Sequence, residues 1–226
     1  MTLSRANPLL LAHAAVADNG LRMETTNAAT RFGEVVEASV ERLTGQCHRL
    51  YEAPALGTLV RAGDDIYGIV SGIATTALDP TRRVIARGAD AETEADVYAE
   101  HPQLERLLRT DVAITVVGHR EGGGTHQYLP SFPPRIHTFL YTCAADEVRA
   151  FMSEGGDARL DFVGLLVGWQ PTGDDVLAAV LRQAALAFDA PRDFLLAASR
   201  AVASLMANDT ARLNAVLRRL PMSDGR

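Results

Sequence analysis

The stretch REGGGTHQYLPSFPPRIHTFLY, residues 120–141, holds the residues of this chain whose types and spacing could do chemistry. Three consecutive glycines at residues 122–124 come after a predicted strand, and a nucleotide cradle uses glycines between a strand and the N-terminus of a helix. The next residues instead include Pro130, Pro133 and Pro134, which cannot open a helix normally. No Gly-Lys-Ser or Gly-Lys-Thr sequence occurs in the chain. The glycines are therefore predicted to form a flexible loop between two strands.

Three histidines, His119, His126 and His137, lie in or beside this loop and could converge if the two flanking strands pair. Zinc sites usually combine histidine with cysteine or carboxylate at fixed spacings. The chain has no HExxH, HxH or CxxC pattern, so no metal site is predicted. In the ordinary interpretation, His126 lies on a solvated loop and His137 on a strand face.

Nucleophilic catalysis has no recognisable pattern in this sequence. There is no GxSxG motif, and Cys47 cannot form a dyad with His48 because neighbouring residues on a strand point to opposite faces. The two cysteines, Cys47 and Cys143, are too few and too far apart for a disulfide framework, and free thiols are predicted. All 22 basic residues are arginine, which excludes Schiff-base and P-loop lysines. We therefore predict no catalytic residue, no cofactor and no enzymatic activity.

Composition and charge narrow the class of partner. The 226 residues are 47% hydrophobic and 22% charged, as in ordinary globular proteins, and the formal net charge is −6. Nucleic-acid binders normally present a basic face, so direct nucleic-acid binding is not expected. Arg82, Arg83 and Arg87 stay open as an anion contact, and a nucleic-acid accessory role would use the same residues. A solvated, salt-bridged surface is the ordinary alternative.

The N-terminal apolar run, residues 9–16, is interrupted by His13 and is too short to cross a bilayer. No other segment is apolar for long enough to do so. We predict no membrane insertion and a cytoplasmic protein.

The elements that must position these residues are first a series of short strands. Turn residues separate them at roughly ten-residue spacing, which is typical of a barrel or sandwich. The glycines of the IYGIVSGI stretch suggest a bulge or bend, as in a small barrel. The predicted strands are residues 34–40, 44–51, 58–61, 65–73, 83–86, 111–118 and 136–142.

The hydrophobic period becomes helical in two other places. Residues 91–109 carry acids in the first half and arginines in the second, which favours helices split by Pro102. Residues 144–151, 175–188, 192–206 and 210–220 are predicted to be helices. Pro191 suits a first helical position, and the stretch Asn208-Asp209-Thr210 offers a cap for the last helix. The predicted fold is α+β. It has an N-terminal arm (1–30), a small antiparallel β-barrel (31–143) with a helical insertion (91–109), and a C-terminal helical module (144–226).

Four stretches of the sequence resemble the HAS-barrel family. They are FGEVVE from Phe32, HRLYEAPALGTLV from His48, IYGIVSGI from Ile66 and LDPTRRVIARG from Leu78. In that family the barrel stands at the N-terminus of HerA-type DNA-translocating ATPases and of ATP synthase subunits. The resemblance implies a barrel that holds a ring together and offers partners a docking surface. The motor domain is not expected here, so no active-site residue is carried over.

We therefore predict a non-enzymatic interaction or assembly module. It would be an adaptor for an oligomeric ATPase or a nucleic-acid-processing complex, or a self-associating barrel. The alternative is a ligand-binding protein or enzyme with a pocket between barrel and tail, where His119, His137 and arginines converge. The predicted contact surface joins exposed aromatics to an arginine, as interface centres often do. It consists of Tyr128, Leu129, Phe132, Pro133, Pro134 and Arg135.

Overall fold

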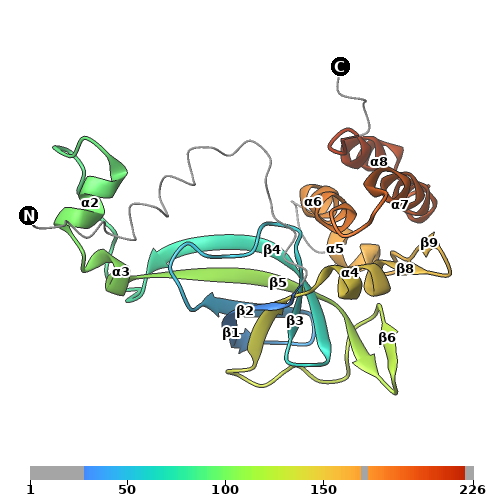
Figure 1. Ribbon diagram of the computed structural model, residues 1–226, viewed down its shortest axis with the longest axis horizontal. Coiled ribbons are helices and arrows are strands. Elements are labelled where there is room, and N and C mark those ends of the chain that lie inside the picture. The colour runs from blue at the N-terminus through green and yellow to red at the C-terminus, as the bar shows by residue number, and fades with distance from the viewer. Residues whose placement is uncertain (1–27, 169–172, 222–226) are drawn as a thin grey trace, which may run out of the picture.

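The structure is a computed structural model that describes residues 28–168 and 173–221 (Figure 1). Strands fill most of the first part, and helices predominate from Ala145 onward. The predicted α+β class is confirmed. Most of the predicted N-terminal arm lies outside the described residues.

One antiparallel sheet of seven strands runs in the order β2-β1-β7-β3-β4-β5-β6. β2 also pairs with β5, from Arg42 opposite Thr115 to Gln46 opposite Asp111. This extra pairing curls the sheet onto itself. Register breaks in β1 and β4 accompany the curl. The predicted small antiparallel β-barrel is found in part, because the sheet is antiparallel and curled but is not closed into a regular barrel. The strands are β1 (Thr30–Ala38), β2 (Arg42–Cys47), β3 (Leu59–Ala62), β4 (Ile66–Ala77), β5 (Leu108–Glu121), β6 (Gly124–His126) and β7 (Phe139–Thr142).

The inside of the curled sheet is an apolar core. Val35, Leu43, Val60, Ile114 and Leu140 each bury their side chain almost completely there. The sequence of β2 explains which of its faces is buried. Leu43, Gly45 and Cys47 point inward and alternate with more exposed neighbours. A Cβ atom on Gly45 would lie 2.3 Å from Leu140 Cδ1, so glycine lets the two strands pack closely.

Tight turns join the neighbouring strands. Gly63 begins the β3–β4 turn with φ +59°, a left-handed conformation that glycine adopts without strain. Gly122 and Gly123 connect β5 to β6 with φ +59° and +81°, directly after Glu121 pairs with Gly124. Two consecutive residues with positive φ make the tight hairpin turn that twisted antiparallel strands prefer. The glycine stretch is therefore a turn between strands, as predicted, and the element after it is a strand.

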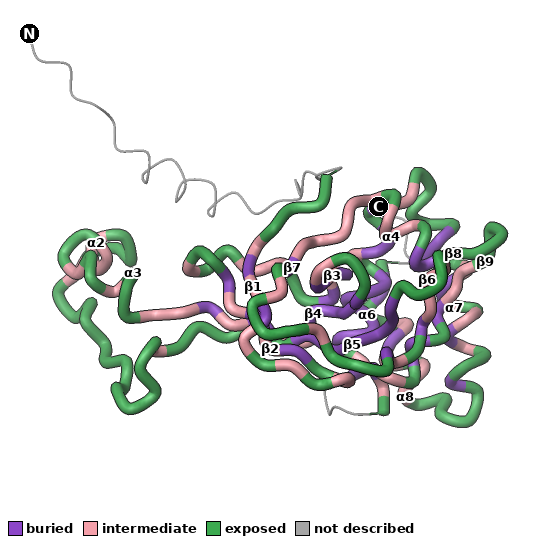
Figure 2. The backbone as a smooth tube through the Cα atoms, turned by 90° about the horizontal axis from the view of Figure 1, so that it is seen from below, coloured by how far each residue is buried: buried purple, intermediate pink, exposed green. Residues whose placement is uncertain are grey.

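The distal halves of β4 and β5 extend from the body as a two-stranded ribbon (Figure 1). The helices α2 (Glu94–Glu100) and α3 (Leu104–Leu107) lie at its end, within the predicted insertion. Thr93 caps α2 through a reciprocal hydrogen-bonded box with Asp96. The expected strand at residues 83–86 is wrong: these residues are exposed and have no regular structure. Exposed residues dominate this end of the molecule, whereas buried residues gather in the body (Figure 2).

The C-terminal helices form a second apolar core against one side of the sheet. Leu177 lies at 0% exposure among Tyr67, Ile69 and Val117 of the sheet and residues of the other helices. Pro191 stands in the first turn of α7, and Asp209 caps α8 by accepting from the Arg212 amide, both as predicted. The elements are α4 (Ala145–Met152), β8 (Ser153–Glu154), β9 (Asp157–Ala158), α5 (Val163–Val167), α6 (Gly173–Ala185), α7 (Pro191–Leu205) and α8 (Thr210–Leu217).

Truncating Leu177 to alanine should destabilise the whole chain. The substitution leaves a cavity where sheet and helices meet, so the free energy of unfolding should fall by about 2–5 kcal/mol. Denaturant titration measures this change. Leu205→Ala is the matched control, because Leu205 is 54% exposed and its truncation should change the free energy by less than about 0.5 kcal/mol. Equal losses for the two variants would contradict the second core.

Candidate functional site

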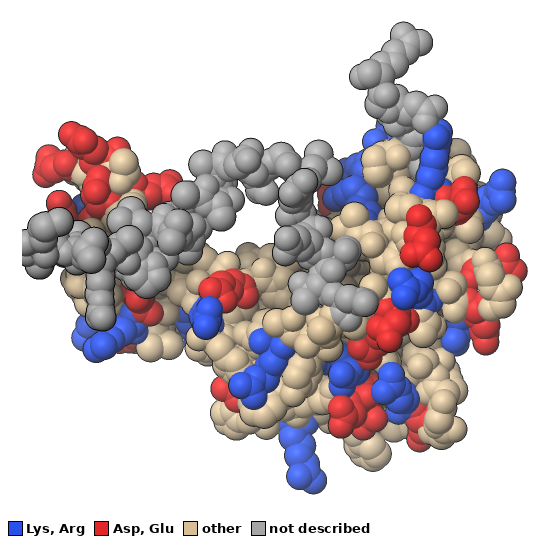
Figure 3. Space-filling view, in the orientation of Figure 1, with Lys and Arg blue, Asp and Glu red and all other residues tan. Residues whose placement is uncertain are grey.

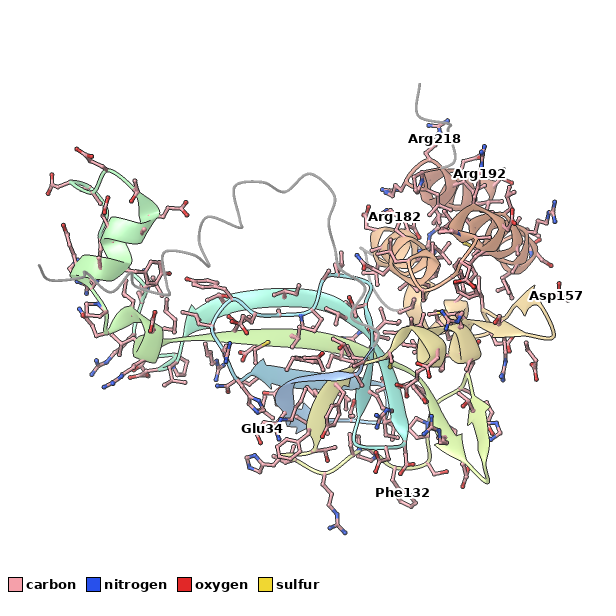
Figure 4. All side chains as sticks on the ribbon, viewed as in Figure 1. Glu34, Phe132, Asp157, Arg182, Arg192 and Arg218 are labelled. Carbon is pink, nitrogen blue, oxygen red and sulfur yellow. The ribbon has the colours of Figure 1, made fainter. Side chains whose placement is uncertain are left out.

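The connection between β6 and β7 presents the predicted contact residues. Phe132 is 80% exposed and Tyr128 is 57% exposed, while Pro133 and Arg135 are also exposed and Pro134 is half-buried. Leu129 is different, because it packs against the core inside the sheet. Phe132, by contrast, does not pack on the sheet. Phe132 projects at the rim of the molecule, on the side away from α6–α8 (Figure 4).

Hydrogen bonds hold both ends of this connection. At its start, buried Gln127 donates to the carbonyls of Phe151 (2.6 Å) and Arg159 (3.1 Å) and accepts from the Asp161 amide (2.7 Å). At its end, the His137 amide donates to the Val35 carbonyl at 2.8 Å. The exposed aromatic in the middle is thus presented by a loop that is fixed at both sides.

Two further apolar side chains, which sequence reasoning missed, are exposed where this connection enters β7. Ile136 is 48% exposed and Phe139 is 42% exposed. The guanidinium of Arg31 lies over the Phe139 ring at 4.6 Å from its centroid. Both residues fall within the predicted strand 136–142, and alternation alone does not reveal which of its residues stay uncovered. We call the exposed residues of this connection and of the start of β7 the loop face. They are Tyr128, Phe132, Pro133, Arg135, Ile136 and Phe139.

The three histidines do not form one site. His119 is buried and packs beside the rings of His126 (5.3 Å) and Tyr128 (5.1 Å). His137 is exposed, has a positive φ of 67°, and contacts Glu34 on β1 through Nδ1 at 3.0 Å. Within residues 28–168 and 173–221 no group of three or more histidine, cysteine or carboxylate side chains could hold a metal ion.

The arginines proposed as an anion contact lie elsewhere, between β4 and α2. Arg82, Arg83 and Arg87 are exposed, and Arg82 pairs with Asp79 at 3.4 Å. Both members of that pair are well solvated, so the contact adds little stability. The acidic side chains around α2 dominate the end of the ribbon in the view of Figure 3. The structure therefore separates these arginines from the loop face.

A polar cluster that sequence reasoning missed joins the sheet to α4. Glu147 accepts from Arg61 Nε and from the Tyr67 hydroxyl, each at 2.9 Å. Arg120 donates to the Tyr67 hydroxyl and lies 3.7 Å from the Glu147 carboxylate. The side chains of Arg61 and Glu147 are 14% and 17% exposed, so the pair is largely removed from water. These residues are dispersed between positions 61 and 147, and no local motif could have signalled them.

Burial sets the acid–base behaviour of the groups around Glu147. Burial, reinforced by the hydrogen bond to Glu147, raises the pKa of the Tyr67 phenol well above its ordinary value. Burial likewise raises the pKa of the Cys143 thiol well above the usual range, and that of Cys47 to about 11. A thiol nucleophile needs a lowered pKa, so neither cysteine is activated for catalysis.

A hollow of about 370 Å³ opens beside this cluster. Three polar side chains of its lining bond to one another. Tyr67 donates to Glu147, and Arg120 donates to the Tyr67 hydroxyl and pairs with Glu147. Its lining residues are Tyr67, Arg120, Thr125, Ala144, Asp146, Glu147, Ala150 and Phe151.

Comparison with known proteins does not assign the chain to a family. No protein-family model matches the chain, and no curated protein is detectably similar to it. Among the described helices, none has the length and apolarity needed to cross a membrane.

Replacing Tyr67 by phenylalanine should alter the stability of the protein at alkaline pH. Because the folded-state pKa of Tyr67 lies above its unfolded value near 10, its contribution is present below pH 10 and is lost as the pH rises through the folded-state pKa. Above pH 10 the wild-type free energy of unfolding should decline by an extra amount of up to about 1.4 kcal/mol per pH unit. The Tyr67→Phe variant should lack that extra decline in denaturant titrations between pH 9 and 11.

Tyr128→Phe is the matched control, because Tyr128 is exposed. The variant retains Tyr67 and its bond to Glu147, so it should keep the extra alkaline decline. If Tyr67→Phe also follows the wild type, the buried phenol does not carry the alkaline loss.

Proposed function

We propose that this protein is a non-enzymatic interaction module that binds a protein partner through the loop face. The observation that carries the proposal is the 80% exposure of Phe132 at the centre of a loop anchored on both sides. Full burial of an exposed phenylalanine side chain contributes about 1.5–3 kcal/mol of favourable free energy, and a partner can supply that burial. Aromatic residues and arginine together are typical of the energetic centre of an interface.

The composition of the loop lowers the entropic cost of binding. Pro133 and Pro134 restrict the backbone beside Phe132, so little conformational freedom is lost when the loop is covered. Arg135 is exposed at the edge and can donate to a carboxylate. The partner that fits is a protein with an apolar groove bordered by acidic side chains.

The class of partner rests on the sequence resemblance alone. The stretches that resemble HAS-barrel proteins favour an adaptor for an oligomeric ATPase or a nucleic-acid-processing complex. The β2–β5 pairing supports the barrel-like part of this proposal, because it curls the sheet as a small barrel requires. The cytoplasmic location stays a prediction.

The alternative, a ligand pocket between sheet and helices, has one observation in its favour, the hollow beside Glu147. The predicted residues do not line it together: His137 lies with Glu34, and His119 lies with His126 and Tyr128. Tyr67, Arg120 and Glu147, which do line it, are already partnered. The interaction module is therefore the better supported function.

Substituting Phe132 should weaken partner binding without affecting the fold. Tagged wild type, Phe132→Ala and Leu205→Ala proteins would be recovered from the native host and their partners quantified by mass spectrometry. A partner that uses the loop face should bind Phe132→Ala about tenfold more weakly or worse, whereas Leu205→Ala should retain it. The free energy of unfolding of Phe132→Ala should stay within about 0.5 kcal/mol of the wild type.

Two results would overturn the proposal. One is a stoichiometric partner that Phe132→Ala and Arg135→Glu both retain at full affinity. The other is recovery of the tagged chain without any other protein at native expression levels.

A further inference from the structure

Along residues 72–77, no strand among the described residues pairs with the edge of β4 that faces away from β5. β3 covers only Ile66 to Ile69, and the loop before β3 bonds the backbone of Val70. From Gly72 to Ala77 the pairing partner among the described residues is β5, on one side only. Every second residue of such a strand directs its amide and carbonyl outward, so residues 72–77, here called the β4 edge, offer backbone groups for a further strand.

From Gly72 to Ala77 neither a charge nor a proline protects this edge against pairing, and the nearest register shift of β4 lies at its start, between Val70 and Gly72. Natural sheets guard exposed edges with charged residues, proline, bulges or very short strands. From Ile66 to Leu78 the chain reads IYGIVSGIATTAL, without a charge or a proline. The four residues 73–76 are all exposed, and β-branched Ile73, Thr75 and Thr76 favour extended backbone.

Exposed apolar side chains continue from the edge toward the end of the ribbon. Ile73 is 46% exposed, and Leu78 and Leu107 are 48% and 44% exposed. The Leu78 amide donates to the Leu107 carbonyl at 2.8 Å, which places these two residues side by side. The ribbon therefore combines an open backbone edge with uncovered apolar surface.

We propose that the β4 edge pairs antiparallel with the β4 edge of a second copy of this chain, about a two-fold axis. An antiparallel strand edge is complementary to itself, since each outward amide meets an outward carbonyl of the same sequence run in reverse. Like charges opposite one another destabilise strand pairs, and this uncharged strand brings none against its copy.

This inference goes beyond the proposed function and does not depend on it. The β4 edge lies on the ribbon, whereas the loop face lies at the β6–β7 connection (Figure 1). A dimer through β4 leaves Phe132 available, so the two surfaces can be tested separately.

Light scattering coupled to size exclusion tests the proposal on the full-length chain. The wild type should be a dimer that dissociates on dilution. The Ala74→Lys/Thr76→Lys variant, which sets like charges across the two-fold axis, should raise the dimer dissociation constant roughly tenfold or more. Leu205→Lys, an exposed apolar residue on α7, is the matched control and should stay dimeric.

Hydrogen exchange at residues 72–77 supplies a second measurement that does not depend on a variant. Amides of the β4 edge should exchange more slowly as protein concentration rises through the dissociation constant. A monomer at about 100 μM, a dimer that the lysine pair leaves intact, or protection of these amides that does not vary with concentration would each overturn the proposal. The last result would mean that a part of the same chain covers the edge.

Discussion

Backbone pairing between β2 and β5 is the constraint on which the rest of this structure depends. It joins strands that are adjacent neither in sequence nor in the main strand order, and so curls the sheet around Val35, Leu43, Ile114 and Leu140. It also uses the β5 edge only as far as Asp111, which leaves the distal ribbon as a separate pair of strands. The apolar interior and the exposed ribbon are thus two consequences of one pairing.

A second constraint holds the helices to this sheet. Their apolar faces pack around Leu177 on one side of the sheet, and Glu147 adds directional contacts with Arg61 and Tyr67. A largely buried carboxylate is costly unless it is well paired, so the cluster specifies how α4 sits more than it adds net stability. The same pairing occupies the groups around the hollow, which is why the geometry favours a structural role for them.

The surfaces left uncovered suggest how the protein could work as an assembly component. The loop face offers an aromatic on an anchored, proline-containing loop, and the β4 edge offers backbone hydrogen bonds. The first is suited to a partner that has a matching groove, whereas the second is suited to an identical strand. A chain with both could present two loop faces on one dimer and gain avidity for an oligomeric partner.

The sequence by itself determined the α+β class, the glycine connection between strands and the starts of α7 and α8, because these depend on residues a few positions apart. Pro191 fixes the first turn of α7, Asp209 accepts from the Arg212 amide at the start of α8, and Gly122 and Gly123 adopt positive φ without strain. Only the tertiary structure decided that residues 83–86 form no strand, that Phe132 is exposed while Leu129 packs inward, and that Glu147 meets Arg61. These outcomes depend on which distant segments come together, because burial and ion pairing are set by neighbours in space. Local periodicity in the sequence does not indicate those neighbours.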